Sequence, residues 1–158
     1  MSIEKINTWL TLLANVGVLI GIVFLALEIQ QNTEIVKAQT RDTVTQKQVE
    51  WLRDIGTDPL AIELLGRGMR GNLKPDEELA YSLITQSNLR MWENEYYQYK
   101  IGLFDDAEFQ PRIKRWKSIM SLSPGRKQVW DTVRHGYSTE FRELIDRLQD
   151  ELELEGGT

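Results

Sequence analysis

The hydrophobic and polar positions divide the chain into a continuous apolar stretch near its start and a mixed remainder. Nineteen residues from Trp9 to Leu27 carry no charge, and only Thr11 and Asn15 interrupt the apolar run. As a helix this stretch would be roughly 28 Å long, which is close to the thickness of the hydrocarbon layer of a bilayer. The pattern therefore predicts a single membrane-spanning helix over 9–27, preceded by an N-terminal tail over 1–8.

Two other kinds of segment share an apolar composition. A buried core helix rarely runs so long without a polar interruption, because one of its faces usually meets water. A cleavable signal peptide has a shorter apolar region and a small-x-small exit, whereas this stretch ends in Leu25-Ala26-Leu27-Glu28. Both alternatives fit the sequence less well than a membrane span.

The next segment, 28–55, contains neither glycine nor proline. We therefore expect the membrane helix to continue as a stalk until Gly56-Thr57-Asp58-Pro59 stops it. Its apolar positions, among them Ile29, Val36 and Val44, are too irregular to predict a coiled coil. The stalk is expected to pack on the following domain at its far end.

The remainder, 56–158, has the periodicity and the capping signals of several helices, and it has no convincing alternation of the kind that predicts a strand. The fold class predicted is all-α: a single N-terminal transmembrane helix that continues into a stalk helix, followed by a small helical bundle. Five bundle helices are expected. The first begins at Asp58-Pro59, and the second begins at Lys74-Pro75 and ends near Phe104. The third begins at Asp105 with Glu108, and Pro111 either kinks it or marks its true first turn; the fourth begins at Ser123-Pro124, and the last lies around Phe141 to Leu152.

Length, charge and the lack of cysteine restrict the functions that remain. With 158 residues the chain has room for one domain besides the anchor, and its formal net charge of −5 disfavours binding to nucleic acid. It contains no cysteine, which excludes disulfides, thiolate metal sites and sulfur nucleophiles.

No pattern of residues predicts catalysis. A di-iron site in a helical bundle takes a Glu-x-x-His motif from each of two helices, and the only histidine, His135, has no glutamate three residues before it. Asp131 lies one turn before His135 and could orient it as a catalytic base. His135 is better interpreted as a surface residue near a helix end, where cationic side chains are favoured. We therefore expect no catalytic residue, metal or cofactor. An enzyme that uses Glu93, Glu95 or His135 is kept only as the least favoured of three hypotheses of function.

Small residues line one face of the predicted span. Gly17 and Gly21 form a GxxxG pattern, Ala14 lies one turn earlier, and the amide of Asn15 could bond to a neighbouring helix. The pattern predicts self-association, although glycine is common in transmembrane helices and the motif also arises by chance.

Polar and aromatic residues are densest around 92–99. Trp92, Glu93, Glu95, Tyr96 and Tyr99 could line a pocket for a small molecule or lipid, or could serve as core residues with carboxylates held by tyrosines and cations. The one concentrated basic patch surrounds Trp116. Its cations, Arg112, Lys114, Arg115 and Lys117, could contact lipid headgroups or form a solvated face with Trp116 turned inward.

Several short segments spread along the chain form a recognisable set. They include Glu28 to Thr33, Asp58-Pro59, Leu73 to Pro75, Glu93-Asn94-Glu95-Tyr96-Tyr97-Gln98-Tyr99, Pro124 to Arg126 and Glu140-Phe141. Together they resemble a family of short bacterial single-pass membrane proteins of unknown function, in which a hydrophobic helix leads into a Gln-Asn-Thr element. The resemblance covers nearly the whole chain and implies an inner-membrane helical protein, with no activity to carry over.

Two hypotheses of function are favoured over the enzyme hypothesis. The first is a membrane-anchored, self-associating assembly or interaction protein without catalytic activity, whose partners are membrane lipids, further copies of the chain and other membrane proteins. The second is an anchored sensor that binds a small molecule or lipid at 93–99. Lys37, Arg41 and Lys47 follow the span and only Lys5 precedes it, which favours a cytoplasmic domain at the bacterial inner membrane.

Overall fold

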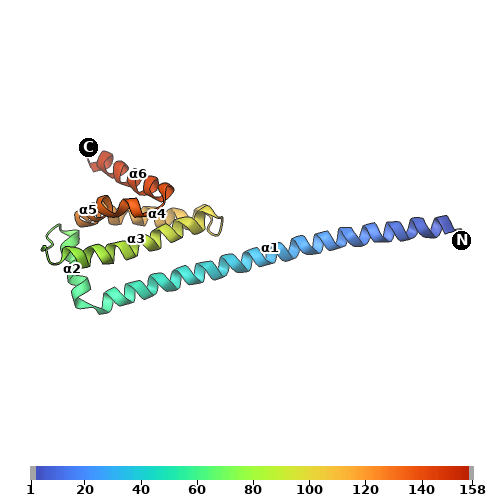
Figure 1. Ribbon diagram of the computed structural model, residues 1–158, viewed down its shortest axis with the longest axis horizontal. Helices are drawn as coiled ribbons and strands as arrows, with labels where there is room; N and C mark the ends of the chain where they lie inside the picture. The colour runs from blue at the N-terminus through green and yellow to red at the C-terminus, as the bar shows by residue number, and fades with distance from the viewer. Residues whose placement is uncertain (1–2, 157–158) are drawn as a thin grey trace. The chain divides into compact units, whose positions relative to one another are not determined.

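The computed structural model describes residues 3–156, with side chains up to residue 152. Every regular element among these residues is helical, which confirms the all-α fold class (Figure 1). The elements are α1 (Ile3–Thr57), α2 (Pro59–Met69), α3 (Glu78–Lys100), α4 (Asp106–Ser121), α5 (Pro124–Val133), the short 3-10 helix η1 (Arg134–Gly136) and α6 (Thr139–Gly156).

The chain forms two compact units, which divide between Gln39 and Thr40. The described part of the first unit consists of α1 alone, and the whole apolar stretch from Trp9 to Leu27 is exposed on it. This helix is long and apolar enough to cross a membrane. Monomeric soluble proteins rarely expose so large a contiguous apolar surface.

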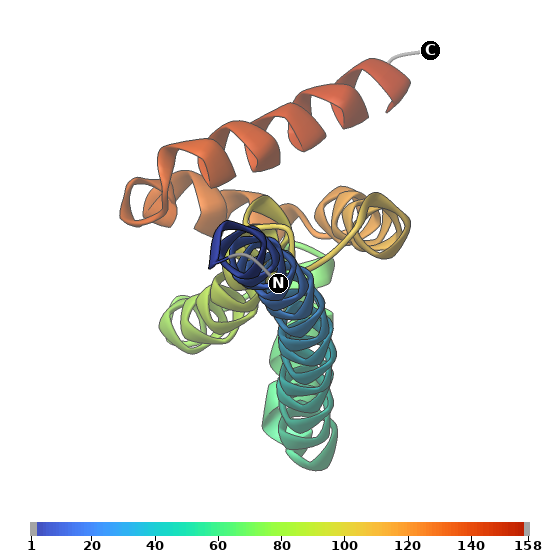
Figure 2. The same cartoon turned by 90° about the vertical axis from the view of Figure 1, so that its right-hand side faces the viewer.

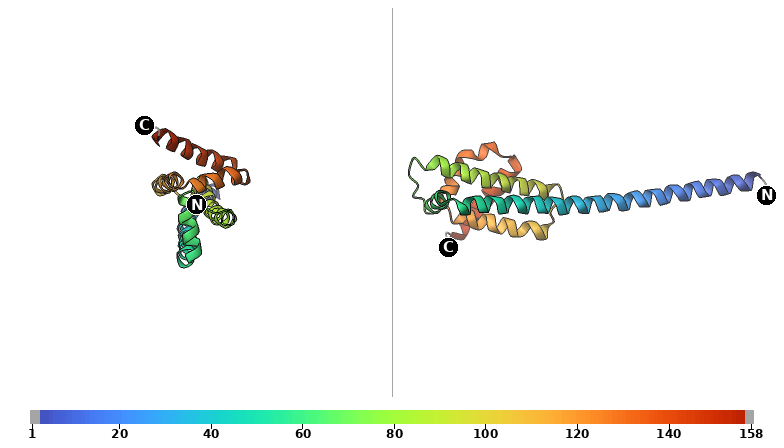
Figure 3. Two further views of the ribbon diagram at one scale, coloured as in Figure 1. Left: turned by 90° about the vertical axis from the view of Figure 1, so that its left-hand side faces the viewer. Right: turned by 90° about the horizontal axis from the view of Figure 1, so that it is seen from below.

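The second unit contains the last part of α1 together with α2 to α6. Figures 2 and 3 show this part of α1 running between α3 and α4, and α6 lies on the opposite side of α4 and α5. The sequence predicted that the far end of the stalk packs on the domain, and Val44 of α1 is indeed only 4% exposed. The sequence predicted a stalk over 28–55 and a helical domain over 56–158. The second compact unit begins at Thr40 and so includes the last part of α1, whose residues contact α3 and α4.

The predicted signals at Gly56-Thr57-Asp58-Pro59 act as expected. Helix α1 ends at Thr57, and the Asp58 carboxylate accepts hydrogen bonds from the backbone N–H groups of Leu60 and Ala61. Pro59 occupies the first position of α2, where its missing N–H costs nothing.

The helix predicted from Lys74-Pro75 to about Phe104 is shorter at both ends. Residues 75–77 form a turn, in which the Glu77 carboxylate accepts a bond from the backbone N–H of Lys74, and α3 begins at Glu78. At its other end α3 stops at Lys100, because Gly102 has a φ of +79°, a conformation that ends a helix.

The predicted starts of α4 and α5 are confirmed, but the residues around them act differently in the two helices. The Asp105 carboxylate accepts a bond from the N–H of Glu108, and Pro111 lies inside α4 beyond its first turn. Ser123 precedes α5 but does not cap it, since its hydroxyl is 2.9 Å from the hydroxyl of Tyr81 instead.

Aromatic side chains from α3, α4, α5 and α6 form the core of the second unit. Trp92 of α3 stacks on Trp116 of α4 with ring centroids 5.1 Å apart, and Phe141 of α6 packs edge-on against Trp116. On the other side, Trp130 of α5 meets the same Phe141 ring edge to face. Such ring geometries add to the free energy of burial, so this cluster holds the four helices together.

Two glycines allow α2 and α5 to approach closely beside Tyr81. A Cβ atom on Gly68 would lie 2.0 Å from the Tyr81 ring, and one on Gly125 would lie 2.8 Å from the Gly68 carbonyl oxygen. Neither distance is compatible with a side chain, so this contact requires glycine at both positions.

Gly68→Ala is therefore expected to lower the free energy of unfolding by about 1–3 kcal/mol, because the tightly packed Tyr81 ring must move. Denaturant unfolding of the full chain in detergent measures this. Gly56→Ala is the matched control: nothing lies within 4 Å of its Cβ position, and alanine there should raise the free energy of unfolding by up to about 1 kcal/mol. A Gly68→Ala protein as stable as the wild type would contradict the close approach.

Candidate functional site

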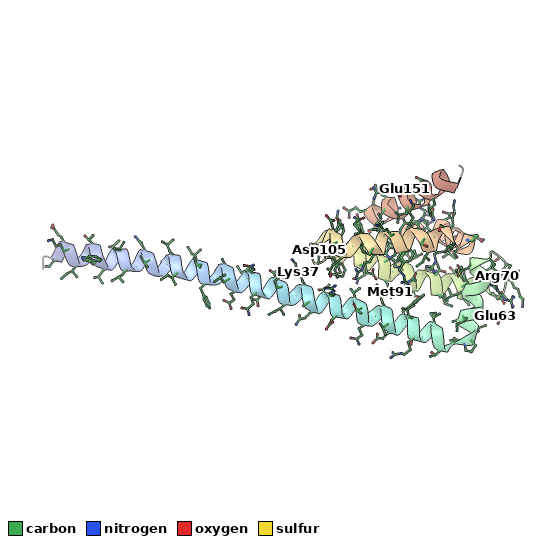
Figure 4. The ribbon with its side chains drawn as sticks, turned by 180° about the vertical axis from the view of Figure 1, so that it is seen from behind. Lys37, Glu63, Arg70, Met91, Asp105 and Glu151 are labelled. Atoms are coloured by element: carbon green, nitrogen blue, oxygen red, sulfur yellow. The ribbon has the colours of Figure 1, made fainter. Side chains whose placement is uncertain are left out.

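A cavity of about 330 Å³ lies within the second unit, where the last part of α1 meets α3, α4 and α5. Figure 4 shows Met91, one of its lining residues, on the side of α3 that faces α1. The walls combine three tryptophan rings with several polar side chains. The residues that line it are Gln48, Trp51, Leu52, Asn88, Met91, Trp92, Glu95, Pro111, Arg112, Arg115, Trp116, Ile119 and Arg126.

Glu95 is the only buried carboxylate of the cavity wall, and its side chain links three helices. It is 1% exposed, and its Oε1 accepts a 2.5 Å bond from Nε2 of Gln48 on α1. Its Oε2 accepts a 3.1 Å bond from Nε of Arg112 on α4. Burial raises the pKa of Glu95 above its ordinary value, although Gln48, Arg112 and Arg115 act in the opposite direction.

Arg126 presents the opposite situation, a buried cation without a carboxylate. The side chain is 6% exposed, its Nη1 donates a 2.7 Å bond to Oδ1 of Asn88, and its guanidinium lies 5.4 Å from the centre of the Trp92 ring. Its Nε has no hydrogen-bond partner. Burial lowers the pKa of Arg126, which still leaves the guanidinium charged.

The remaining two arginines differ in how firmly they are held. Arg112 is engaged by Glu95, by the carbonyl oxygen of Glu108 and by the Phe104 ring, 4.6 Å from its guanidinium. Arg115 is exposed at the cavity edge, and none of the hydrogen bonds or ion pairs found among the described residues involves its side chain. The cavity thus carries three cations and one carboxylate.

The residues of the predicted ligand cluster are divided between different faces of α3. Two of them, Trp92 and Glu95, line the cavity together. Glu93 instead accepts bonds from the backbone N–H of Ser138 and from Arg90, and these bonds lower the pKa of Glu93 although burial raises it. These contacts fix the chain between η1 and α6.

Both predicted tyrosines of the cluster are directed to the aromatic core and not to the cavity. Tyr96 packs against Phe109 and Phe141, at centroid distances of 6.1 Å to each ring. Tyr99 stacks on Phe109 and its hydroxyl donates a 2.6 Å bond to Asp106. Of the two alternatives given by the sequence, a pocket lining or a core position, Tyr96 and Tyr99 fit the core position.

The predicted basic patch is also divided. Arg112 and Arg115 line the cavity, whereas Lys117 forms an ion pair with Glu151 of α6 and Lys114 is exposed. Trp116 is turned inward and is 2% exposed, as the alternative interpretation of this segment expected. A contact of the patch with lipid headgroups stays a prediction.

The other predicted positions lie elsewhere. Ala14, Asn15, Gly17 and Gly21 are exposed on α1 in the first unit, and no atom lies within 4 Å of a Cβ built on either glycine. His135 is exposed in η1. Among the described residues no group of three or more His, Asp and Glu side chains could hold a metal ion.

Three polar residues of the cavity wall, Gln48, Asn88 and Arg126, were not among the site residues predicted from the sequence. A usable signal existed on α3, because Asn88, Trp92 and Glu95 are spaced by four and three residues and therefore share a helical face. Nothing in the sequence indicated that Arg126 would be buried.

No protein family, curated protein or solved structure matches the chain. The resemblance to the bacterial single-pass family therefore stays a prediction, and function is argued from the residues alone.

Glu95→Gln tests the buried carboxylate through the pH dependence of stability. Because the pKa of Glu95 is raised above its ordinary value of 4.5, the folded chain binds more protons than the unfolded chain between these two pKa values. The free energy of unfolding of the wild type therefore loses this contribution as the pH rises from about 4.5 through the raised pKa. The amide of the variant keeps one acceptor for Arg112, and its NH2 group can donate to the Gln48 oxygen once the Gln48 amide turns over. We expect the variant to gain stability relative to the wild type over that window.

Denaturant unfolding at a series of pH values measures this difference. Glu143→Gln, an exposed change on α6, controls for the loss of one negative charge. A stability difference between Glu95→Gln and the wild type that does not vary with pH would contradict the raised pKa.

Proposed function

We propose that this chain is a single-pass membrane protein whose helical domain is an assembly or interaction module without catalytic activity. The observation that carries the proposal is the exposed apolar helix from Trp9 to Leu27, which has the length of a bilayer core and no charged residue. In lipid all backbone groups of this segment are satisfied within the helix, so a membrane explains both its composition and its exposure.

Self-association of the anchor is the second part of the proposal. Gly17 and Gly21 lie one turn apart on α1, and the space above both is open. A second helix can approach closely at such a face, where packing and weak interhelical contacts replace the hydrophobic effect. Ala14 extends the face by a turn, and the amide of Asn15 would gain a bonding partner on the neighbouring helix, an interaction of about 1 kcal/mol.

The proposed location is the bacterial inner membrane with the helical domain in the cytoplasm. Three cations, Lys37, Arg41 and Lys47, follow the span within the distance over which positive charges set orientation. Lys5 is the only Lys or Arg before it. Membrane lipids, further copies of the chain and other membrane proteins are the proposed partners.

Replacing both Gly17 and Gly21 by leucine is expected to abolish the oligomer while leaving the chain in the membrane. The leucine side chains prevent close approach of two helices, but they keep the span apolar. Crosslinking in native membranes and the mass of the particle in mild detergent would measure the oligomer, and sedimentation with the membrane fraction would measure anchoring.

The matched control replaces Val23 and Ala26 of the same helix by leucine, because at about 100° per residue both lie on the side of the helix opposite Gly17 and Gly21. An unchanged oligomer in the double glycine variant would show that this face has no role in assembly. Release of the wild-type protein from membranes by alkaline carbonate would contradict the anchor itself.

A further inference from the structure

We propose that the cavity between α1, α3, α4 and α5 binds a small organic anion, whose carboxylate or phosphate group pairs with Arg126 and Arg115 while its apolar part lies against the tryptophan rings. This is a binding activity of the second unit, and it does not depend on the assembly function proposed for the anchor.

The strongest reason is the state of Arg126. A guanidinium that is removed from water normally has a carboxylate or several acceptors, because an unpaired buried charge is costly. Arg126 has one acceptor, the Asn88 amide, and its buried Nε has none. The Arg126 side chain is part of the cavity wall, so an anion in the cavity would place the missing negative charge next to this guanidinium.

The charges of the other lining residues favour the same sign of ligand. Glu95 is hydrogen-bonded to Gln48 and Arg112, whereas neither Arg126 nor Arg115 forms an ion pair with a carboxylate among the described residues. Three guanidinium groups beside one carboxylate give the cavity wall a net positive charge, which attracts an anion and repels a cationic ligand. Guanidinium groups bind carboxylates and phosphates through two parallel hydrogen bonds, which makes these groups the best-matched chemistry.

The remaining wall indicates what the anion carries with it. Trp51, Trp92 and Trp116 come from three different helices and line the same space. Indole faces suit a planar or aliphatic apolar group, and a volume of about 330 Å³ is at the lower end of the range for small-molecule sites. We therefore infer a ligand with one anionic group and one small apolar group.

Because α1 forms one wall of the cavity, a bound ligand would affect how α1 packs on the other helices of the second unit. Gln48, Trp51 and Leu52 form its α1 wall, and Trp51 is held by a 3.0 Å bond from its indole N–H to Ser87 of α3. An occupant would therefore contact α1 and the bundle at once and would strengthen their association within the second unit.

Calorimetric titration of the full chain in phosphatidylcholine nanodiscs tests the proposal, with phenyl phosphate and benzoate as probes and benzamide as the neutral counterpart of benzoate. We expect one anion per chain to bind and benzamide to bind at least about tenfold more weakly, as loss of a charged hydrogen bond implies. Tryptophan fluorescence should change upon binding of the anions, because three indoles line the cavity.

Arg126→Gln is expected to weaken binding of the anions by about tenfold or more, and Arg115→Gln by a smaller factor because its side chain is exposed. Arg147→Gln is the matched control: it removes the same charge from an exposed position of α6 outside the cavity and should leave the affinity unchanged. If Arg126→Gln does not fold, Arg115→Gln and Arg126→Lys decide, since both should bind more weakly than the wild type.

Nanodiscs containing phosphatidylglycerol distinguish the two sources of the anionic group. Weaker apparent binding of phenyl phosphate in these discs, dependent on Arg126, identifies a lipid headgroup as the occupant, and unchanged binding identifies a free anion. The proposal is overturned if no anion binds at millimolar concentration in either disc, or if the Arg126 and Arg115 variants that fold bind as the wild type does.

Discussion

The buried carboxylate of Glu95 determines how α1 is joined to the helices of the second unit. A carboxylate that is 1% exposed requires hydrogen bonds, and its two oxygens obtain them from Gln48 of α1 and Arg112 of α4. The arrangement therefore joins three helices at one point. It matters most for α1, since Val44 is the only fully buried residue that this helix contributes.

The polar character of this junction explains why a cavity lies beside it. The aromatic core is concentrated where α3, α4, α5 and α6 meet, so α1 approaches the bundle through longer polar side chains and leaves space near Trp92 and Arg126. In the same chain, the first part of α1 has the composition of a membrane span. One helix thus serves the proposed anchor and also forms a wall of the proposed binding site.

The sequence was sufficient for features that depend on local physics. The apolar run, the cap at Asp58 with Pro59 and the cap at Asp105 are set by neighbouring residues, and the structure contains all three. The candidate site depends on contacts between distant segments and was predicted only in part. Trp92 and Glu95 line the cavity, but Tyr96 and Tyr99 belong to the core, and the burial of Arg126 arises from packing of α5 that no local pattern records.

Amide hydrogen exchange in a Glu95→Ala protein tests the central role of this carboxylate most directly. Alanine removes the acceptors of Gln48 and Arg112, so the account predicts faster exchange across residues 42–57 of α1, measured by mass spectrometry. Amides of α6 should keep their protection, because Phe141 and Ile145 are buried in the aromatic core and not beside Glu95. Unchanged protection of residues 42–57 in the variant would contradict the account.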